Sequence, residues 1–240
     1  MPGLLALDSS TEVLAIALIH AGETLTYEAE GGAQASSRLV PQAMQLLERA
    51  GLTLAELDAI AFGAGPGAFT GLRTACAVAQ GLAFGAGKPV LALDSLLLVA
   101  EDARQQAEAS GLALQGPIWV AMDARMNEIY AAAYQWEGRG WQCLVNPALY
   151  SLEALQARWA EDAPQALAGS ALEPFGLTNQ AARHWPRTDS RARALGALAA
   201  QAWGRGELID AAEAMPVYIR DKVALTTAER EAARAAAEGA

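Results

Sequence analysis

The stretch LLALDSSTEVLAIALI, residues 4 to 19, sets an aspartate and three hydroxyl side chains between two apolar segments. Leu4 to Leu7 is continuously apolar, as expected of a buried strand, and the run ends at Asp8. Val13 to Ile19 follows at once, so the two segments are predicted to be antiparallel strands joined by a polar turn.

The same pattern restarts in the second half of the chain. Ile118 to Asp123 is another apolar run that ends in an aspartate, and Ile129 to Tyr134 is the apolar segment after its turn. A repeated strand, aspartate, turn and strand indicates duplication of an α/β lobe. A chance likeness of two short hairpins is the alternative.

The segments between and after these hairpins alternate in the manner of an α/β protein. Cap residues and apolar spacing predict helices over residues 37–50, 70–84, 95–109, 151–159 and 195–203, and strands over 24–28, 57–62, 89–93 and 165–168. We therefore expect an N-terminal α/β lobe over 1–112 and a C-terminal α/β lobe over 113–225. The tail 226–240, nearly all Ala, Glu and Arg, has no apolar face and is expected to fray.

The composition describes an acidic globular protein. The chain of 240 residues has a formal net charge of −10 and a pI near 4.7. Such a chain is a poor electrostatic match to a bare phosphate backbone, so any nucleic acid would need positive charge from elsewhere. The first residues lack the basic region of a signal peptide, and no apolar run reaches the roughly 18 residues that cross a bilayer, which predicts a cytoplasmic protein without membrane contact.

The turn formed by Asp8, Ser9, Ser10 and Thr11 brings a carboxylate and hydroxyls next to free backbone amides. This arrangement suits a phosphate or a magnesium ion, but it equally suits a turn that satisfies its own backbone. Both interpretations stay open. The turn after Asp123 lacks hydroxyls and is less like a ligand site.

The loop GAGPGAFTG, residues 63 to 71, raises a similar choice. Its glycines, including Gly65 and Gly67, precede a helix whose N-terminus attracts anions, so a weak nucleotide or phosphate site together with the Asp8 turn is one interpretation. The loop matches neither GxxxxGK[ST] nor GxGxxG. The helix that follows is unusually rich in alanine and includes Gly81, which favours close packing as the role of the small residues.

Catalytic patterns are missing from the sequence. No histidine pair has metal-ligand spacing, no GxSxG elbow occurs, and neither cysteine has a plausible histidine partner nearby. We therefore predict no catalytic residues, no metal site and no required cofactor.

Four segments carry a resemblance to a known family: LALDSSTEVLAIAL, DAIAFGAGPGAFTGLRTACAVAQGLAFG, MDARMNEIYAAAY and MPVYIRDKVA. In this order they resemble the bacterial TsaB (YeaZ) family of tRNA threonylcarbamoyladenosine biosynthesis proteins. The likeness spans nearly the whole chain and is weakest over 144–214. It implies two similar lobes of the actin-like, Hsp70-like fold.

The resemblance also implies a function without catalysis by the chain itself. Family members are scaffolds that pair with TsaD, the enzyme that transfers threonylcarbamoyl to the adenosine beside the anticodon of tRNAs that read ANN codons. TsaD has a metal-binding His-x-x-x-His, and residues 35–42 of this chain contain no histidine. The implied partners are TsaD, the ATPase TsaE docked on the pair, a second copy of the chain in isolation, and tRNA only through the complex.

The family places the TsaD contact on the helices predicted over 37–50 and 70–84. Helical spacing then selects the candidate interface residues, which are Val40, Met44, Leu47, Arg73, Ala77, Gln80 and Phe84. Weak binding of ATP or ADP by the Asp8 turn is the accompanying expectation. An independent phosphotransferase is an alternative that the fold permits, and a peptidase is a second, which the lack of a nucleophile or metal ligands opposes.

Overall fold

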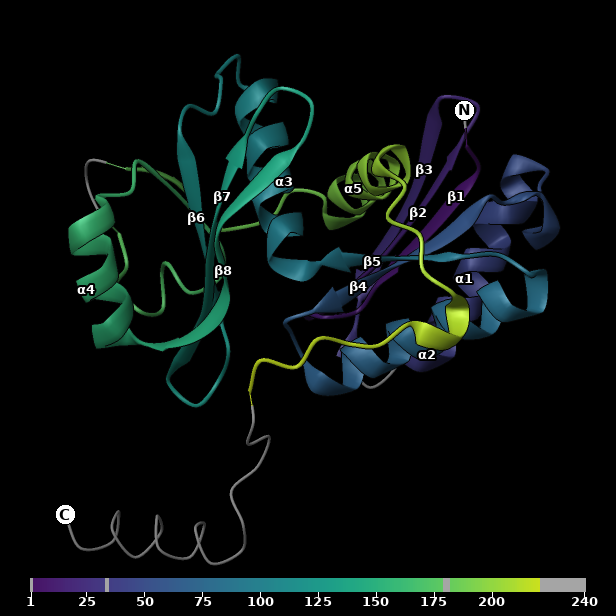
Figure 1. Cartoon of the computed structure of the whole chain (residues 1–240), viewed down its shortest axis with the longest axis horizontal. Helices are drawn as coiled ribbons and strands as arrows, with labels where there is room; N and C mark the ends of the chain where they lie inside the picture. The colour runs from purple at the N-terminus through teal and green to yellow at the C-terminus, as the bar shows by residue number, and fades with distance from the viewer. Residues whose placement is uncertain (1, 33–34, 179–181, 221–240) are drawn as a thin grey trace, which may run out of the picture.

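The computed structural model describes residues 2–32, 35–178 and 182–220, and it contains two five-stranded sheets that lie side by side (Figure 1). The first sheet has the strand order β3-β2-β1-β4-β5 and the second the order β10-β9-β6-β7-β8. Read from opposite ends, the two orders are the same. Two similar α/β lobes are therefore confirmed.

The elements follow the predicted order closely. The strands of the first sheet are β1 (Leu4–Asp8), β2 (Val13–His20), β3 (Glu23–Glu30), β4 (Ala59–Gly65) and β5 (Val90–Asp94). The strands of the second are β6 (Pro117–Asp123), β7 (Glu128–Trp136), β8 (Trp141–Ser151), β9 (Ala166–Ala168) and β10 (Arg183–Trp185). The helices are α1 (Ala35–Ala50), η2 (Leu54–Glu56), α2 (Phe69–Ala86), α3 (Ser95–Ala109), α4 (Leu152–Asp162), α5 (Arg191–Arg205) and η3 (Ala211–Glu213).

Strand register shows that the two hairpins are equivalent. In the first, β1 pairs antiparallel with β2 so that Asp8 is opposite Ala15, and β1 also pairs parallel with β4. In the second, β6 pairs antiparallel with β7 so that Asp123 is opposite Ile129, and β6 pairs parallel with β9. Each aspartate is thus the last residue of the central strand of its sheet.

Successive side chains of a strand point to opposite faces of the sheet, so each face packs against its own layer of helices. Leu5 and Leu7 face α1 and α2, whereas Leu4 and Ala6 face α5 on the opposite side of the first sheet. Helix α3 packs on the inner face of the second sheet, and α4 covers its outer face (Figure 1). The central strands are buried on both faces, which is why they read as continuous apolar runs.

Three features differ from the expectation. The sequence does not predict strand β8, because as an edge strand it has no fully buried residue and lacks a clear apolar alternation. The sequence also does not predict the three-residue edge strand β10, which lies in a loop-rich stretch. The sequence places helix α5 in the second lobe, but it packs against β1 and β2 of the first. Its Gly196 lies so close to the first sheet that a Cβ there would stand 3.3 Å from the Cβ of Ala17.

The predicted extent of the C-terminal lobe, residues 113–225, therefore needs correction, since the segment from α5 to η3 returns to the first lobe. Ile209, which precedes η3, exchanges backbone hydrogen bonds with Val90 of β5. The expected tail 226–240 lies outside the described residues. Among the helices of the described ranges, none is long and apolar enough to cross a membrane.

Candidate functional site

A cleft of about 570 Å³ opens between the two lobes. Its walls come from the turn after β1, the loop before α2, the first residues of α3, the turn after β6 and the segment that follows η3. The lining polar side chains are Ser10, Thr11, Glu12, Ser95, Asp123, Arg125, Tyr130, Ser170, Arg191, Tyr218 and Arg220. Both repeated turns thus reach the same cleft.

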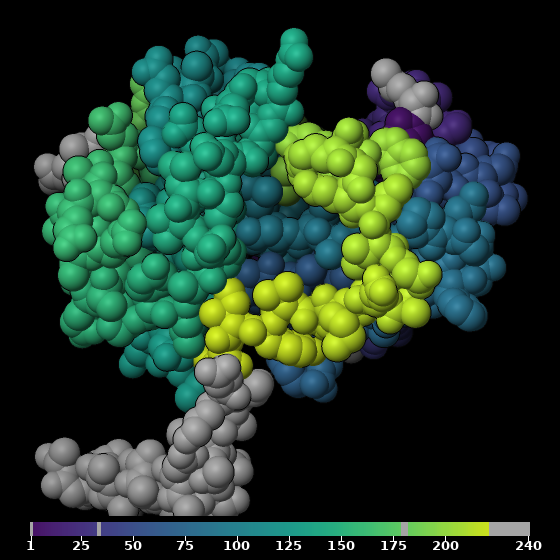
Figure 2. Space-filling model, viewed as in Figure 1, coloured from purple at the N-terminus to yellow at the C-terminus, as the bar shows by residue number. Residues whose placement is uncertain are grey.

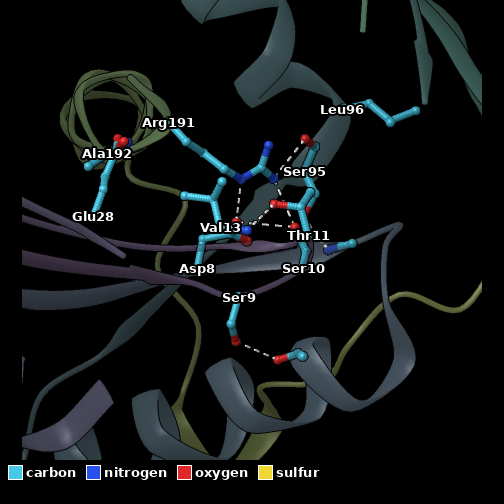
Figure 3. Close-up of polar contacts among 12 residues, drawn as sticks. Asp8, Ser9, Ser10, Thr11, Val13, Glu28, Ser95, Leu96, Arg191 and Ala192 are labelled. Carbon is cyan, nitrogen blue, oxygen red and sulfur yellow. Dashed lines mark hydrogen bonds and ion pairs between the residues drawn. The ribbon is translucent and has the colours of Figure 1, made fainter. Parts of the chain in front are cut away.

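Asp8 is not among the residues that line this cleft. Its carboxylate is fully buried, and Oδ2 accepts hydrogen bonds from Arg191 Nε at 2.5 Å and from the Ser10 hydroxyl at 3.1 Å (Figure 3). Its Oδ1 lies against Gly63, where a Cβ would stand 1.8 Å away. The carboxylate that was expected to bind a ligand therefore forms a buried ion pair with Arg191 instead. The role of Asp8 in the turn is chiefly structural.

Arg191 closes the floor of the cleft from the first turn of α5. Besides Asp8, its guanidinium donates to the Ser10 hydroxyl at 2.8 Å and to the carbonyl oxygen of Ser95 at 3.4 Å. The helix is held in place by Glu28 of β3, which accepts from the backbone N–H of Ala192 (Figure 3). One cation therefore joins α5, the turn after β1 and the start of α3.

The other predicted nucleotide-binding residues separate into two groups. Ser10, Thr11 and Gly67 line the cleft, whereas Ser9 and Gly65 do not. The Ser9 hydroxyl points toward α2 and donates to the carbonyl oxygen of Gly71 at 2.8 Å (Figure 3). The expected cluster is thus brought together only in part, and weak nucleotide binding stays a prediction.

The glycine loop answers the choice between anion binding and packing. A Cβ at Gly71 would stand 1.8 Å from the carbonyl oxygen of Ser9, and one at Gly67 would stand 2.5 Å from that of Ser10. The backbone N–H of Ala68 donates to the carbonyl oxygen of Ser10 at 2.7 Å. The glycines let the start of α2 approach the turn after β1 backbone to backbone, as the packing interpretation predicts.

This contact predicts opposite effects for two glycines of the same helix. Gly71→Ala should lower the free energy of unfolding by about 3 kcal/mol or more, because backbone has to move away from the new Cβ. Gly81→Ala should raise it by about 0.5–1 kcal/mol, because a Cβ added at Gly81 would meet no atom within 4 Å and alanine favours helix. Urea unfolding measures both; equal effects would contradict the close approach.

A second carboxylate, that of the partly buried Asp94, links the two lobes. Asp94 ends β5 and caps α3 by accepting from the backbone N–H groups of Leu96 and Leu97. Its Oδ2 also accepts from the Tyr134 hydroxyl of β7 at 2.5 Å. Burial raises the pKa of Asp94 above its ordinary value of 3.8, although these hydrogen bonds oppose the shift. Burial first, and then Asp94, raises the pKa of Tyr134 well above its usual range.

The raised pKa of Asp94 sets the sign of a pH effect. The folded chain binds this proton more tightly than the unfolded chain does, so the contribution of Asp94 to stability falls as pH rises from 3.8 through the folded-state pKa. Asp94→Asn keeps a cap and an acceptor but does not ionise. We expect its free energy of unfolding, relative to wild type, to increase across this range. Parallel stability profiles in denaturant titrations from acid to neutral pH would contradict the assignment.

The outer surface of α1 and α2 lies on the first lobe, away from the cleft floor. Phe84 is 81% exposed, and Val40 and Met44 are also exposed. Arg73 and Ala77 face outward as well, whereas the other face of α2 lies in the first lobe's core through Leu72, Ala75, Cys76, Ala79 and Ala83. We call the exposed residues Val40, Met44, Arg73, Ala77 and Phe84 the outer face.

Two of the candidate interface residues do not belong to this outer face. Leu47 is buried in the core at 1% exposure, because α1 turns the row Leu39, Ala43, Leu46 and Leu47 toward the sheet. Gln80 is half-buried, and its side-chain amide donates to the carbonyl oxygen of Ala211 at 3.0 Å. The spacing i, i+4 and i+7 wrongly grouped Leu47 with Val40 and Met44. These three residues cross from the exposed face of α1 to its buried face.

Sequence reasoning missed three polar residues of the cleft. Arg191 and Arg220 come from segments far along the chain, and no local motif marks their partners. Ser170 follows β9, and its hydroxyl accepts from the backbone N–H of Asp123 at 3.2 Å, which supplies the hydroxyl that the second turn lacks in sequence. Among the described residues, no group of three or more His, Cys, Asp or Glu side chains is placed to hold a metal.

Comparison with known proteins finds relatives that are similar in sequence and in fold. Residues 30–183 match the family model of TsaD, described as tRNA N6-adenosine threonylcarbamoyltransferase. The solved structure of YeaZ from Pseudomonas aeruginosa is 37% identical, with a TM-score of 0.78 over 91% of this chain and 100% of that one. The chain belongs to the TsaD family, and within it to the TsaB/YeaZ proteins.

Other TsaB/YeaZ relatives support the same placement. A P. aeruginosa structure described as an uncharacterized protein similar to peptidase YEAZ has a TM-score of 0.81 at 36% identity, over 92% of this chain and 100% of that one. The tRNA threonylcarbamoyladenosine biosynthesis protein TsaB of Haemophilus influenzae is 41% identical over 53% of this chain and 51% of its own length. TsaB of Escherichia coli is 28% identical over 92% of this chain and 96% of its own length.

Proposed function

We propose that this chain is a non-catalytic subunit that pairs with TsaD in the biosynthesis of threonylcarbamoyladenosine in tRNA. The observation that carries the proposal is the outer face of α1 and α2. It exposes Phe84, Val40 and Met44 on a surface with no covering element among the described residues. Large exposed apolar side chains gathered on two neighbouring helices are typical of a protein interface.

The centre of this surface consists of small residues, which leave room for a second helix to approach. Ala77, Gly81 and Gly85 are exposed along α2, and a Cβ added at either glycine would meet no atom within 4 Å. Small residues allow helix backbones to come close, and Phe84 would then act as an anchor at one end. TsaD is the proposed occupant, and a second copy of the chain is the occupant in its absence.

The cleft supports a scaffold better than a phosphotransferase. The carboxylate best placed by sequence to hold magnesium, that of Asp8, is paired with Arg191 inside the protein. Binding of tRNA is assigned to the complex, because the chain has a formal net charge of −10. TsaE is proposed to dock on the pair, and the setting is the cytoplasm, where tRNA is modified.

A reconstitution assay tests the proposal. Purified chain incubated with threonylcarbamoyl-adenylate and unmodified tRNA should yield no modified nucleoside, and addition of TsaD should give modification that depends on this chain. Modified tRNA in the absence of TsaD would refute the scaffold role. Low-micromolar affinity of the isolated chain for ATP would instead favour the phosphotransferase.

A further inference from the structure

The segment from Ala211 to Arg220, here called the strap, runs from the first lobe across the opening between the lobes (Figure 2, yellow). It follows α2 in the opposite direction. The carbonyl oxygens of Ala211 and Ala214 accept from Gln80 and Cys76, and farther along the Tyr218 hydroxyl accepts from Arg73 Nε at 2.9 Å. The strap is thus bound along the flank of the proposed docking helix.

The contact between Arg73 and Tyr218 connects the strap to the outer face itself. The Arg73 guanidinium carbon lies 3.8 Å from the ring centroid of Phe69, and the rings of Phe69 and Tyr218 are 5.1 Å apart. Tyr218 remains 43% exposed. A protein that docks on α2 therefore meets Arg73 and Tyr218 as one unit.

The strap then enters the cleft and ends on the second lobe. The backbone N–H of Val217 donates to the carbonyl oxygen of Ala64 at 2.7 Å. Two residues beyond Tyr218, the Arg220 guanidinium donates to Glu128 Oε2 at 2.5 Å and to the carbonyl oxygen of Arg125 at 3.2 Å. Its side chain is only 14% exposed, so this ion pair is partly shielded from water.

The receiving loop has an unusual backbone. Arg125, Met126 and Asn127 have φ values of 65°, 57° and 58°, so three consecutive residues other than glycine are left-handed. Such conformations persist only where surrounding contacts hold them. Arg220 supplies such contacts, because its Nη1 also lies 3.7 Å from the sulfur of Met126. Arg220 thus contacts two of the three left-handed residues, Arg125 and Met126.

The same loop is tied back to the first lobe. Arg125 forms an ion pair with Glu12, which follows the Asp8 turn, and its backbone N–H donates to Asp123 at 2.7 Å. Two separate ion pairs therefore hold the loop: Arg125 pairs with Glu12 of the first lobe, and Glu128 pairs with Arg220 of the strap.

We propose that the strap couples the outer face of α2 to the loop 124–128 across the cleft, with Arg220 as the positioning residue. A partner that binds Arg73 and Tyr218 fixes the strap, and the strap holds the loop through Arg220. Loss of Arg220 releases the loop. It also weakens the binding of the partner at Arg73 and Tyr218, because coupling between two sites is reciprocal. The identity of that partner as TsaD rests on the proposed function.

Hydrogen exchange on the chain alone tests the first half. Arg220→Ala should speed exchange of the backbone N–H groups of Val217, Ala124 and Glu128, which bond to Ala64, Glu128 and Arg125. Glu128→Gln, which keeps side-chain size, should act in the same way. Arg158→Ala removes a surface pair within α4 and should leave all three unchanged. Unchanged exchange in a folded Arg220→Ala chain would overturn the proposal.

Addition of TsaD tests the second half. TsaD should slow exchange over residues 124–128 in the wild type but not in Arg220→Ala, and its affinity for that variant should fall about ten-fold. Equal protection of the loop in the wild type and in Arg220→Ala would show that TsaD contacts the loop directly. No protection in either chain would show that the strap does not couple the two sites. Either result overturns the proposal. Failure of TsaD to bind the wild type would refute the proposed function and leave the exchange result on the isolated chain as the test of the strap.

Discussion

Arg191→Met should lower the free energy of unfolding by about 3 to 5 kcal/mol, because it leaves the buried carboxylate of Asp8 without its cation. Asp8 is 0% exposed and Arg191 is 2% exposed, so water replaces none of the lost contacts. The same change also removes the bonds to Ser10 and Ser95, which join three elements at the cleft floor. Chemical denaturation followed by circular dichroism measures the loss.

Two further variants separate the buried charge from general damage. Arg158→Met removes an exposed ion pair to Asp162 within α4 and should cost no more than about 0.5 kcal/mol. The double variant Asp8→Asn, Arg191→Met removes both charges and should recover a large part of the loss, since neither partner is left buried and charged. A single Arg191→Met variant as stable as Arg158→Met would contradict the structural role of the pair.

Ala77→Trp should abolish pairing with TsaD while the chain remains folded. Ala77 is exposed in the middle of the outer face, between Arg73 and Phe84 along α2. An indole there would hold the two helices apart, which costs the contact about 1–3 kcal/mol by overpacking and also removes Phe84 from its partner. Analytical gel filtration with and without TsaD measures the loss, and the homodimer should disappear as well.

Ala157→Trp is the matched control, because Ala157 is an exposed alanine within α4 on the other lobe. It should leave pairing with TsaD unchanged. Equal pairing of TsaD with the Ala77→Trp chain would remove α2 from the interface. An unfolded Ala77→Trp chain would show that this position is packed against its own lobe, contrary to its exposure.

Local chemistry was enough to predict most of the fold from sequence. The repeated apolar run that ends in Asp8 and again in Asp123 indicated the duplicated lobe, and the two sheets have matching strand orders. Strand β8 escaped because an exposed edge strand carries little apolar pattern. The position of α5 escaped because its alanines and Gly196 fit either lobe equally well in sequence, and only the close contact with β1 and β2 decides between them.

The site was predictable only where neighbours in sequence are neighbours in space. The glycine loop and the Asp8 turn were found from local sequence, but only the structure shows that they pack against each other. The cation that pairs with the Asp8 carboxylate is Arg191, and no residue near Asp8 in the sequence indicates this distant partner. Leu47 was misplaced for a related reason, since helical spacing defines a row of residues but not the side on which the sheet lies.

The docking of TsaD on the outer face of α1 and α2 is most directly tested by the exchange footprint of the pair. Backbone exchange of the wild-type chain should slow over residues 73–85 and near Val40 and Met44 when TsaD is added, and exchange in α4 should not change. That result would place TsaD on the outer face. Protection confined to α4 or to the far side of the second lobe, with α2 exchanging at its free rate, would contradict the account.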